Sequence, residues 1–181
     1  HRLDCAEDVV LGDRGKWETW MSARKQLAEQ WEPSMESERL ATLSSYKVVD
    51  RAPDAAFDRI TKLVADIFAA PIAAISVIDD EHEWFKSAVG LSVSSNDRDA
   101  SLCEIMLDER RPIIVEDAEK DPRFRDNPMV SDDPHIRFFA GAPLVAPNGM
   151  ILGALWVADT VPRFRITENR ANQLASMAEI V

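Results

Sequence analysis

The sequence predicts an α+β fold built on one antiparallel sheet, because two strand pairs are joined by short turns. Ile72–Ile78 is a continuous apolar run rich in branched residues, and Glu83–Val89 returns with alternating side chains after a short acidic turn. A second pair, Ile136–Val145 and Met150–Ala158, is joined through Pro147-Asn148-Gly149, which suits a tight hairpin turn. Strands joined this tightly run antiparallel, and helical segments flank both pairs.

The first 34 residues are expected to form a helical extension outside a main domain at 35–181. Gly15–Trp31 is rich in helix-forming residues, and Glu32-Pro33 ends the pattern. Apolar side chains recur there at heptad-like spacing, namely at Trp17, Trp20, Leu27 and Trp31. So much apolar area does not stay in water, so this stripe either packs on the main domain or pairs with a second copy.

Two helices are predicted before the first hairpin. Met35–Val49 places apolar residues on one helical face, and Ala55–Ala69 does so more strongly before Pro71 stops it. These residues are Leu40, Leu43 and Tyr46 in the first helix, and Phe57, Ile60, Val64, Ile67 and Phe68 in the second.

The middle of the chain predicts a polar loop, a short helix and a third strand. Gly90–Ala100 is polar, and Ser101 with Glu104 matches a capping box that would start a helix running to about Glu109. Pro112–Glu116 is predicted as a strand.

A long irregular loop then leads to the second hairpin, and such loops are often binding loops or lids. A last helix is expected after Thr167, which can cap it. Its predicted buried face carries Ala171, Leu174, Ala175 and Ala178.

Bulk composition limits the partners. A formal net charge of −11 and a pI near 4.7 repel phosphate backbones, so nucleic acid is not an expected partner. No apolar run approaches the roughly 20 residues that span a bilayer, so we expect no membrane contact by this segment. Cys5 and Cys103 lie far apart, as is typical of a reducing cytoplasm. A start at His1 and an end inside a helical pattern indicate a piece of a longer protein.

Motifs for catalysis or metal binding are not recognisable. His82 and His135 have no Cys or His neighbour at metal-ligand spacing. The sequence shows neither a glycine-rich phosphate loop nor a serine elbow. We therefore predict no catalytic residues, no metal and no cofactor.

Several blocks of residues recur in a characteristic order and spacing. They are ERLATL with YKVVD, FD at 57–58, PIAAISVID at 71–79, WFKS with a following glycine at 84–90, SLC at 101–103, VEDAEKDPRFRDNPMV at 115–130, IRFFAGAPL at 136–144, and GALWVAD with PR at 153–163. Together they resemble the GAF domain, and specifically the subgroup fused to bacterial histidine kinases and diguanylate cyclases. The resemblance covers about Glu38 to Val181.

The resemblance implies an antiparallel sheet of five or six strands. It places the N- and C-terminal helices on one face and a pocket under loops and short helices on the other. It implies a non-catalytic sensory module of a cytoplasmic signal-transduction protein, which binds a small molecule or acts by dimerisation. A homodimer through the terminal helices and a covalently linked output domain are its expected partners.

Four departures from the family pattern limit which ligands this domain is expected to bind. Leu102 and Ile105 replace an aromatic residue and a histidine usual in the subgroup. Cys103 is followed by Glu104 and not by the histidine that bilin-binding relatives need, and the pattern of cyclic-nucleotide binders is not recognisable. Trp156 stands where the subgroup usually has a small cysteine, so it can fill the space of a ligand.

The candidate ligand-binding residues are polar or aromatic positions in the strands and the long loop. Their alternative roles are structural: core packing for the aromatic residues, and hydrogen bonds within the loop for Asp117, Arg123 and Asn127. The candidates are Trp84, Cys103, Asp117, Phe124, Asn127, Arg137, Phe138 and Trp156.

Two of these residues have sharply different alternatives. Cys103 is either a reactive thiol in the first turn of a helix or a small buried side chain. Arg137 either receives an anionic ligand or pairs with Asp117 or Asp121 to hold the loop.

Two further functions stay open beside the sensory one. One is a purely structural dimerisation scaffold whose pocket is occluded by Trp156. The other is a GAF-type reductase of free methionine sulfoxide, which needs a second cysteine close to Cys103.

Overall fold

The computed structural model describes residues 34–49, 54–164 and 168–181. The chain divides into two compact units, His1–Glu38 and Arg39–Val181, and the sheet lies in the second. The predicted helix Gly15–Trp31 and the predicted cap at Thr167 fall outside the described residues.

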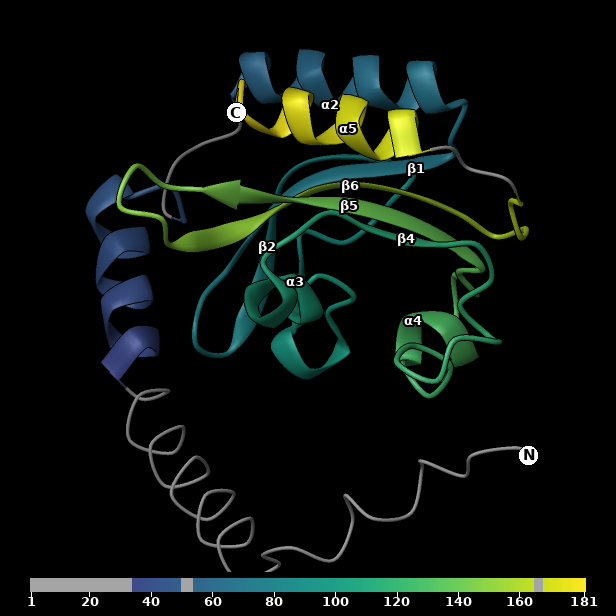
Figure 1. Cartoon of the computed structure of the whole chain (residues 1–181), viewed down its shortest axis with the longest axis horizontal. Helices are drawn as coiled ribbons and strands as arrows, with labels where there is room; N and C mark the ends of the chain where they lie inside the picture. Colours follow the sequence, from purple (N-terminus) through teal and green to yellow (C-terminus); the bar gives the residue numbers. More distant parts are fainter. Residues whose placement is uncertain (1–33, 50–53, 165–167) are drawn as a thin grey trace, which may run out of the picture. The chain divides into compact units, whose positions relative to one another are not determined.

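A six-stranded sheet forms the centre of the second unit (Figure 1), and every neighbouring pair in it is antiparallel. Its order is β3-β2-β1-β6-β5-β4, so the two predicted hairpins meet along β1 and β6. Both central strands are buried along their whole lengths. The predicted α+β class is confirmed. The strands are β1 (Ile72–Ile78), β2 (His82–Val89), β3 (Ser95–Asp97), β4 (Ile113–Val115), β5 (Phe138–Val145) and β6 (Ile151–Asp159).

Close backbone approach explains one glycine at the centre of the sheet. A Cβ on Gly153 would lie 1.9 Å from the carbonyl oxygen of Ser76 and 2.6 Å from Cα of Val77. No side chain fits there, so only glycine lets β6 approach β1 at this point. The predicted turn at Asn148-Gly149 is also confirmed, since Gly149 has a φ of +83°.

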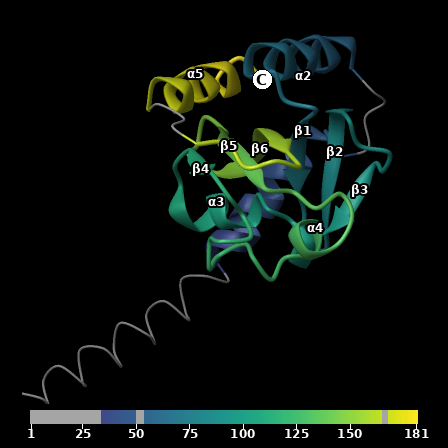
Figure 2. The ribbon, with the colours of Figure 1, turned by 90° about the vertical axis from the view of Figure 1, so that its right-hand side faces the viewer.

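Two helices cover one face of the sheet, α2 (Ala55–Phe68) and α5 (Glu168–Ala178) (Figures 1 and 2). The carboxylate of Asp54 accepts a hydrogen bond of 2.8 Å from the amide of Ala56 and so caps α2. The buried residues of this layer, from the helices and the facing strands, are Val64, Ala65, Phe68, Ala70, Ala73, Ile75, Phe138, Ala140, Ala142, Leu155, Val157, Leu174 and Ala178.

The helix predicted at Met35–Val49 spans 34–46, and it ends where Lys47 has a positive φ of 54°. Arg39 donates a hydrogen bond of 2.6 Å to the carbonyl of Ile78. Leu43 packs in a small cluster with Val77, Ala146 and Leu152.

Short helices and loops cover the opposite face, as predicted: η1 (Arg98–Ala100), α3 (Glu104–Glu109) and α4 (Pro128–Ser131) (Figure 1). The sequence did not predict β3 or α4, because three or four residues are too few to show a period. Asn127 caps α4 by accepting a hydrogen bond of 2.8 Å from the amide of Met129, and Pro128 occupies its first turn.

Arg163 ties the end of α2 to the end of β6. Its guanidinium donates hydrogen bonds of 2.6 Å to each of the carbonyls of Phe68 and Ala69, which α2 leaves without helical partners. It also pairs with Asp159, which is 8% exposed, and lies 5.2 Å from the ring centre of Phe138. One cation thus stabilises a helix C-terminus and neutralises a buried acid.

We expect Arg163→Met to lower the free energy of unfolding by about 1–3 kcal/mol, because it leaves Asp159 and two carbonyls without their charged partner. Urea denaturation measures this change. Arg125→Met is the matched control, since Arg125 is exposed and its guanidinium lies 3.4 Å from the carboxylate of exposed Asp126. The control should stay within about 0.5 kcal/mol of the wild type. Equal losses in both variants would contradict the role given to Arg163.

Candidate functional site

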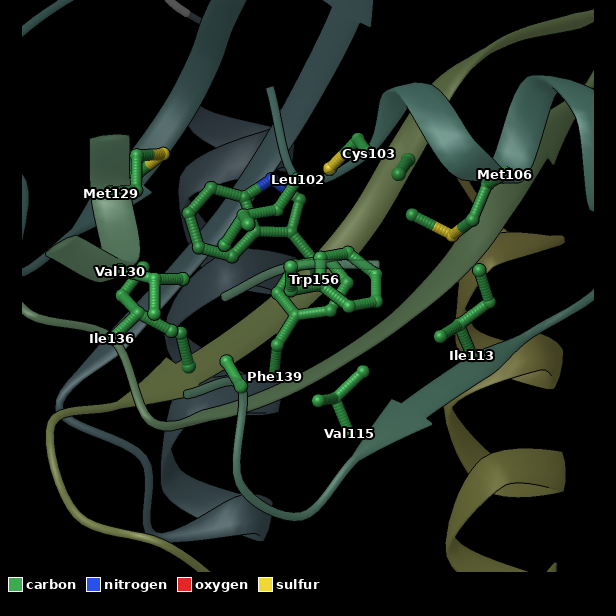
Figure 3. Packing of buried hydrophobic residues seen from close by; sticks show 14 of the residues in the cluster. Leu102, Cys103, Met106, Ile113, Val115, Met129, Val130, Ile136, Phe139 and Trp156 are labelled. Carbon is green, nitrogen blue, oxygen red and sulfur yellow. The ribbon is translucent and has the colours of Figure 1, made fainter. Parts of the chain in front are cut away.

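An aromatic row fills the space between the sheet and the α3–α4 layer. Trp156 on β6 lies at its centre (Figure 3), with its ring centre 5.8 Å from that of Phe139 on β5 and 6.0 Å from that of Phe85 on β2. Phe124, from the long loop, continues the row 6.0 Å beyond Phe139. The row therefore joins three strands to the loop that covers them.

Apolar side chains surround this row on both sides (Figure 3). Met106 of α3 is among the least exposed of them. It packs against the sheet at Gly141, where a Cβ would lie only 2.6 Å from Cε of Met106. The labelled members are Leu102, Cys103, Met106, Ile113, Val115, Met129, Val130, Ile136, Phe139 and Trp156.

A small polar cluster lies inside this apolar layer. Glu83 of β2 is only 1% exposed, and its carboxyl accepts a hydrogen bond of 2.6 Å from the hydroxyl of Ser76 on β1. The indole N–H of Trp156 donates to the same hydroxyl at 3.2 Å. Sγ of Cys103 lies 3.9 Å from it. The hydroxyl of Ser101 accepts a hydrogen bond of 3.0 Å from the amide of Cys103. We call these five residues the Glu83 cluster.

Strand pairing brings the Glu83 cluster together. β1 lies between β2 and β6, so groups of all three strands can meet over one face. Alternation along β1 places Ser76 on the same face as Ala74 and Ile78, which belong to this apolar layer. The segment before α3 adds Ser101 and Cys103 from above.

Burial controls the protonation of both acidic groups in the cluster. It raises the pKa of the Glu83 carboxyl above its ordinary value, although hydrogen bonds from Ser76, Ser101 and their neighbours act in the opposite direction. Burial raises the pKa of the Cys103 thiol well above its ordinary value, and Glu83 raises it further whenever its carboxyl is ionised. The cluster thus favours a neutral acid and a protonated thiol of low nucleophilicity.

Ion pairs at the rim hold the covering layer in place. Arg98 pairs with Glu104 at 2.9 Å, and Arg123 pairs with Glu109 at 2.9 Å and with Asp121 at 2.7 Å. The guanidinium of Arg123 also lies 5.2 Å from the ring centre of Phe124. These contacts fix α3 to η1 on one side and to the long loop on the other.

The predicted capping box is wrong. Cys103 occupies the N-cap of α3 without a side-chain hydrogen bond, and the carboxylate of Glu104 turns to Arg98. The fork of the guanidinium offers Glu104 a charge-assisted partner that a backbone amide does not match.

The structure places three of the predicted site residues, Cys103, Phe124 and Trp156, inside the apolar layer. Asn127 lies at its edge, where it caps α4 and donates a hydrogen bond of 3.1 Å to the carbonyl of Ala100. Asp117 is largely buried and pairs with Lys120 at 2.8 Å, while its Oδ1 has no partner among the described residues.

Three predicted site residues lie elsewhere. Phe138 points to the α2–α5 side, because neighbouring residues of a strand face opposite ways, and Phe139 takes its place beside Trp156. Trp84 packs with Leu43 and Val77 and donates its indole N–H to Asp79.

Arg137, the third of them, pairs with neither of the two predicted acids. It lies 3.4 Å from the carboxylate of Glu119 and donates a hydrogen bond of 3.1 Å to the carbonyl of Val130. Arg137 therefore holds the loop, as the structural alternative predicted, but it does so through Glu119 and not through Asp117 or Asp121.

Sequence reasoning missed the polar core of the site, namely Ser76, Glu83 and Ser101. Ser76 sits in an apolar run and Glu83 opens a strand, so each resembles an ordinary strand residue. The sequence does contain a signal for Glu83. Alternation along the strand places this acid on the same face as the aromatic Phe85, which indicates a buried polar group.

Within the described ranges, no group of three or more His, Cys, Asp or Glu side chains is placed to hold a metal ion. No helix in that same part of the chain is both long and apolar enough to cross a membrane.

Comparison with known proteins identifies the family. The family model described as GAF domain matches residues 52–181. A cyclic di-GMP phosphodiesterase of Pseudomonas aeruginosa, PA2567, is 36% identical over 149 residues, which are 82% of this chain and 25% of that protein. The chain thus spans about a quarter of that relative's length.

Solved structures of low identity share the fold. The GAF domain of an Acinetobacter phosphoenolpyruvate-protein phosphotransferase has a TM-score of 0.57 at 18% identity. The matched region covers 82% of this chain and 89% of the Acinetobacter chain. The free methionine-R-sulfoxide reductase of Neisseria meningitidis has a TM-score of 0.58 at 17% identity, and the match covers 80% of this chain and 84% of the reductase chain. The domain of a putative two-component sensor histidine kinase of Sinorhizobium meliloti has a TM-score of 0.53 at 17% identity, and the match covers 72% of this chain and 88% of the kinase domain.

We expect Glu83→Gln to change the pH dependence of stability. A raised pKa means that the folded state binds the proton more tightly, so the contribution of Glu83 is complete below the unfolded value near 4.5 and is lost as pH rises through the folded value. The amide mimics the neutral acid. The stability of the variant relative to the wild type should therefore rise with pH above about 4.5 and then level off.

Urea denaturation from pH 4 to 8 measures this difference. Glu81→Gln, at an exposed position of the same hairpin, controls for the loss of one charge from an acidic protein. A difference for Glu83→Gln that falls with rising pH would contradict the neutral acid.

Proposed function

Because the chain belongs to the GAF domain family, we propose that it is a non-catalytic regulatory module of a larger cytoplasmic signalling protein. Its input is a small molecule that enters the Glu83 cluster. The similarity to a cyclic di-GMP phosphodiesterase, of which the chain spans a quarter, supports a place beside an output domain. A histidine kinase or a diguanylate cyclase are alternative output domains.

The buried carboxyl of Glu83 is the observation that carries this proposal. Placing an acid, two hydroxyls and an indole N–H inside an apolar layer costs free energy unless each group is paired, and an apolar core would avoid that cost. The groups come from three strands and from the segment before α3. A ligand with a donor group can replace the Ser76 hydroxyl as the partner of Glu83.

Entry requires α3 to move away from the sheet, because Met106 and Trp156 fill the space beneath it. The pairs Arg98–Glu104 and Arg123–Glu109 that hold this layer are partly exposed, and such pairs contribute only about 0–1 kcal/mol each. The layer is therefore closed by packing that a ligand of similar volume can replace.

The two central strands offer a route to the helices. β1 carries Ser76 toward the Glu83 cluster and Ile75 toward the α2–α5 layer, and β6 carries Trp156 and Leu155 in the same way. A ligand that displaces Trp156 would thus act on strands that support both helices. It shifts the helices only if it binds one of their arrangements more tightly than the other.

A thermal-shift screen against a broad panel of metabolites tests the proposal. We expect at least one compound to raise the midpoint of unfolding by several degrees in the wild type and to lose most of that effect in Glu83→Gln. Glu81→Gln serves again as the control and should respond as the wild type does. A panel without hits, or hits of equal size in Glu83→Gln, would favour the alternative of a structural scaffold occluded by Trp156.

The reductase of free methionine sulfoxide is the less favoured function, although one such enzyme shares the fold. That chemistry needs an accessible thiolate and a second thiol to resolve it. Cys103 is 1% exposed and its thiol pKa is raised, while Cys5 lies outside the residues that match the family model.

Dimerisation is a second candidate function, and the outer surface of the helical side favours it. Leu63 of α2 is 54% exposed and Ile180, just after α5, is 73% exposed. Exposed apolar patches on the surface of a domain are typical of faces that pair with another copy.

We expect sedimentation to show a dimer of the wild type at micromolar concentration. The double variant Leu63→Glu/Ile180→Glu should be a monomer, because a dimer of this variant would bury the two introduced carboxylates at its interface. Val93→Glu, at a loop residue that is 56% exposed, is the matched control and should stay dimeric. A monomeric wild type would remove this candidate.

A further inference from the structure

The helical side of the sheet contains a hollow that is separate from the Glu83 cluster. Its volume is about 360 Å³, more than twice that of an apolar cavity of roughly 150 Å³ that binds benzene. Ile75, Val77 and Leu152 form its apolar floor and are each at most 8% exposed. The sheet separates this hollow from the aromatic row, because Ile75 and Trp156 belong to layers on opposite faces.

Three helices contribute to the walls of the hollow. Tyr46 comes from the end of the helix 34–46, Phe57 from α2 and Ala178 from α5. The hairpin between β5 and β6 completes the rim, where Val145 is 59% exposed. A molecule in the hollow would therefore touch all three of these helices.

The charged side chains among the described lining residues are Lys86 and Glu179, and both are stabilised where they lie. The ammonium of Lys86, on β2, donates a hydrogen bond of 3.0 Å to the carbonyl of Val49. Glu179 lies exposed at the rim, where water solvates its carboxylate. A charged ligand would lose its own hydration and would have to compete for these contacts, whereas an uncharged ligand would leave them in place.

The shape of the hollow favours a small molecule over a protein partner. A stable protein interface buries roughly 1,200–2,000 Å² of surface. The floor offers little exposed surface for such an interface, because it lies below the helices and the hairpin. The exposed large apolar side chains among the described lining residues are Tyr46 and Val145, at 44% and 59%.

We propose that this hollow binds a small uncharged molecule with an aliphatic or aryl body, which covers Ile75, Val77 and Leu152. The affinity comes from burial of apolar surface, so it should grow with the length of an aliphatic chain, by about fourfold for each buried methylene. The site is independent of the proposed input at Glu83. Its occupant changes the arrangement of the helices only if it binds one arrangement more tightly than another.

Straight-chain alcohols from 1-butanol to 1-octanol are suitable probes, and octanoate is the charged analogue of the longest one. In methyl NMR spectra of the wild type, 1-octanol should produce saturable shifts at Ile75, Val77 and Leu152 at millimolar concentration or below. The methyl groups of Ile78, on the other face of β1, should not follow the same titration. The dissociation constant should fall about fourfold per methylene along the series, and octanoate should bind roughly tenfold more weakly than 1-octanol.

Two tryptophan variants test the place of binding. Val145→Trp, at the exposed rim, should fill the hollow and abolish the binding of 1-octanol. Val93→Trp, at a loop residue that is 56% exposed and does not line the hollow, is the matched control and should bind as the wild type does. The midpoint of thermal unfolding without ligand checks the fold of each variant, and the titrations of the wild type decide the proposal where a variant is unstable.

Four results would overturn the proposal. They are the absence of saturable shifts at Ile75 and Val77, an affinity that does not grow with chain length, octanoate binding as tight as that of 1-octanol, and equal effects of the two tryptophan variants. Shifts centred on Met106 that disappear in Glu83→Gln would overturn it too, and would assign the probe to the proposed input site. Shifts of Ile75 and Val77 on dilution of the protein alone would assign the hollow to a second copy and would also overturn it.

Discussion

The hydrogen bond between Ser76 and Glu83 is the constraint around which this domain is arranged. It joins β1 to β2 at 2.6 Å inside an apolar layer, and Trp156 of β6 donates to the same hydroxyl. A buried carboxyl without such partners would destabilise the fold by several kcal/mol. The register of the three strands, the start of α3 and the raised pKa of the Glu83 carboxyl therefore depend on one another.

Alternation along the central strands divides the domain into two independent layers. One face of β1 and β6 carries the Glu83 cluster, and the other carries the apolar layer beneath α2 and α5. The same alternation points the side chains of two adjacent phenylalanines to opposite faces of the sheet. Phe139 packs on Trp156, whereas Phe138 lies under the guanidinium of Arg163. The two layers are separate clusters of buried side chains, so the strands between them offer a route by which a signal on one face can reach the other.

Most of the fold could be predicted from local patterns, and the site only in part. The hairpins, α2 and α5 follow from apolar periodicity and from turn residues such as Asn148-Gly149. The position of α3 was predicted from a capping box that the structure does not form. The face of each strand residue did not follow, because alternation fixes which side chains share a face but not which face meets the helices. The sequence therefore predicts Phe138 and Trp84 as pocket residues, whereas Phe139 and Phe85 lie beside Trp156 in the structure. Glu83 was missed because its partner Ser76 becomes visible only once strand pairing is known.

The protonation state of Glu83 tests the central claim most directly. Carbon-13 NMR of the side-chain carboxyl, assigned by its loss in Glu83→Gln, follows this state from pH 3 to 9. We expect a carboxyl signal that stays in the protonated position above the ordinary glutamate value of 4.5 and responds to any compound found to bind the cluster. A signal that titrates at or below that value would show an ionised acid in contact with water, and would contradict the account.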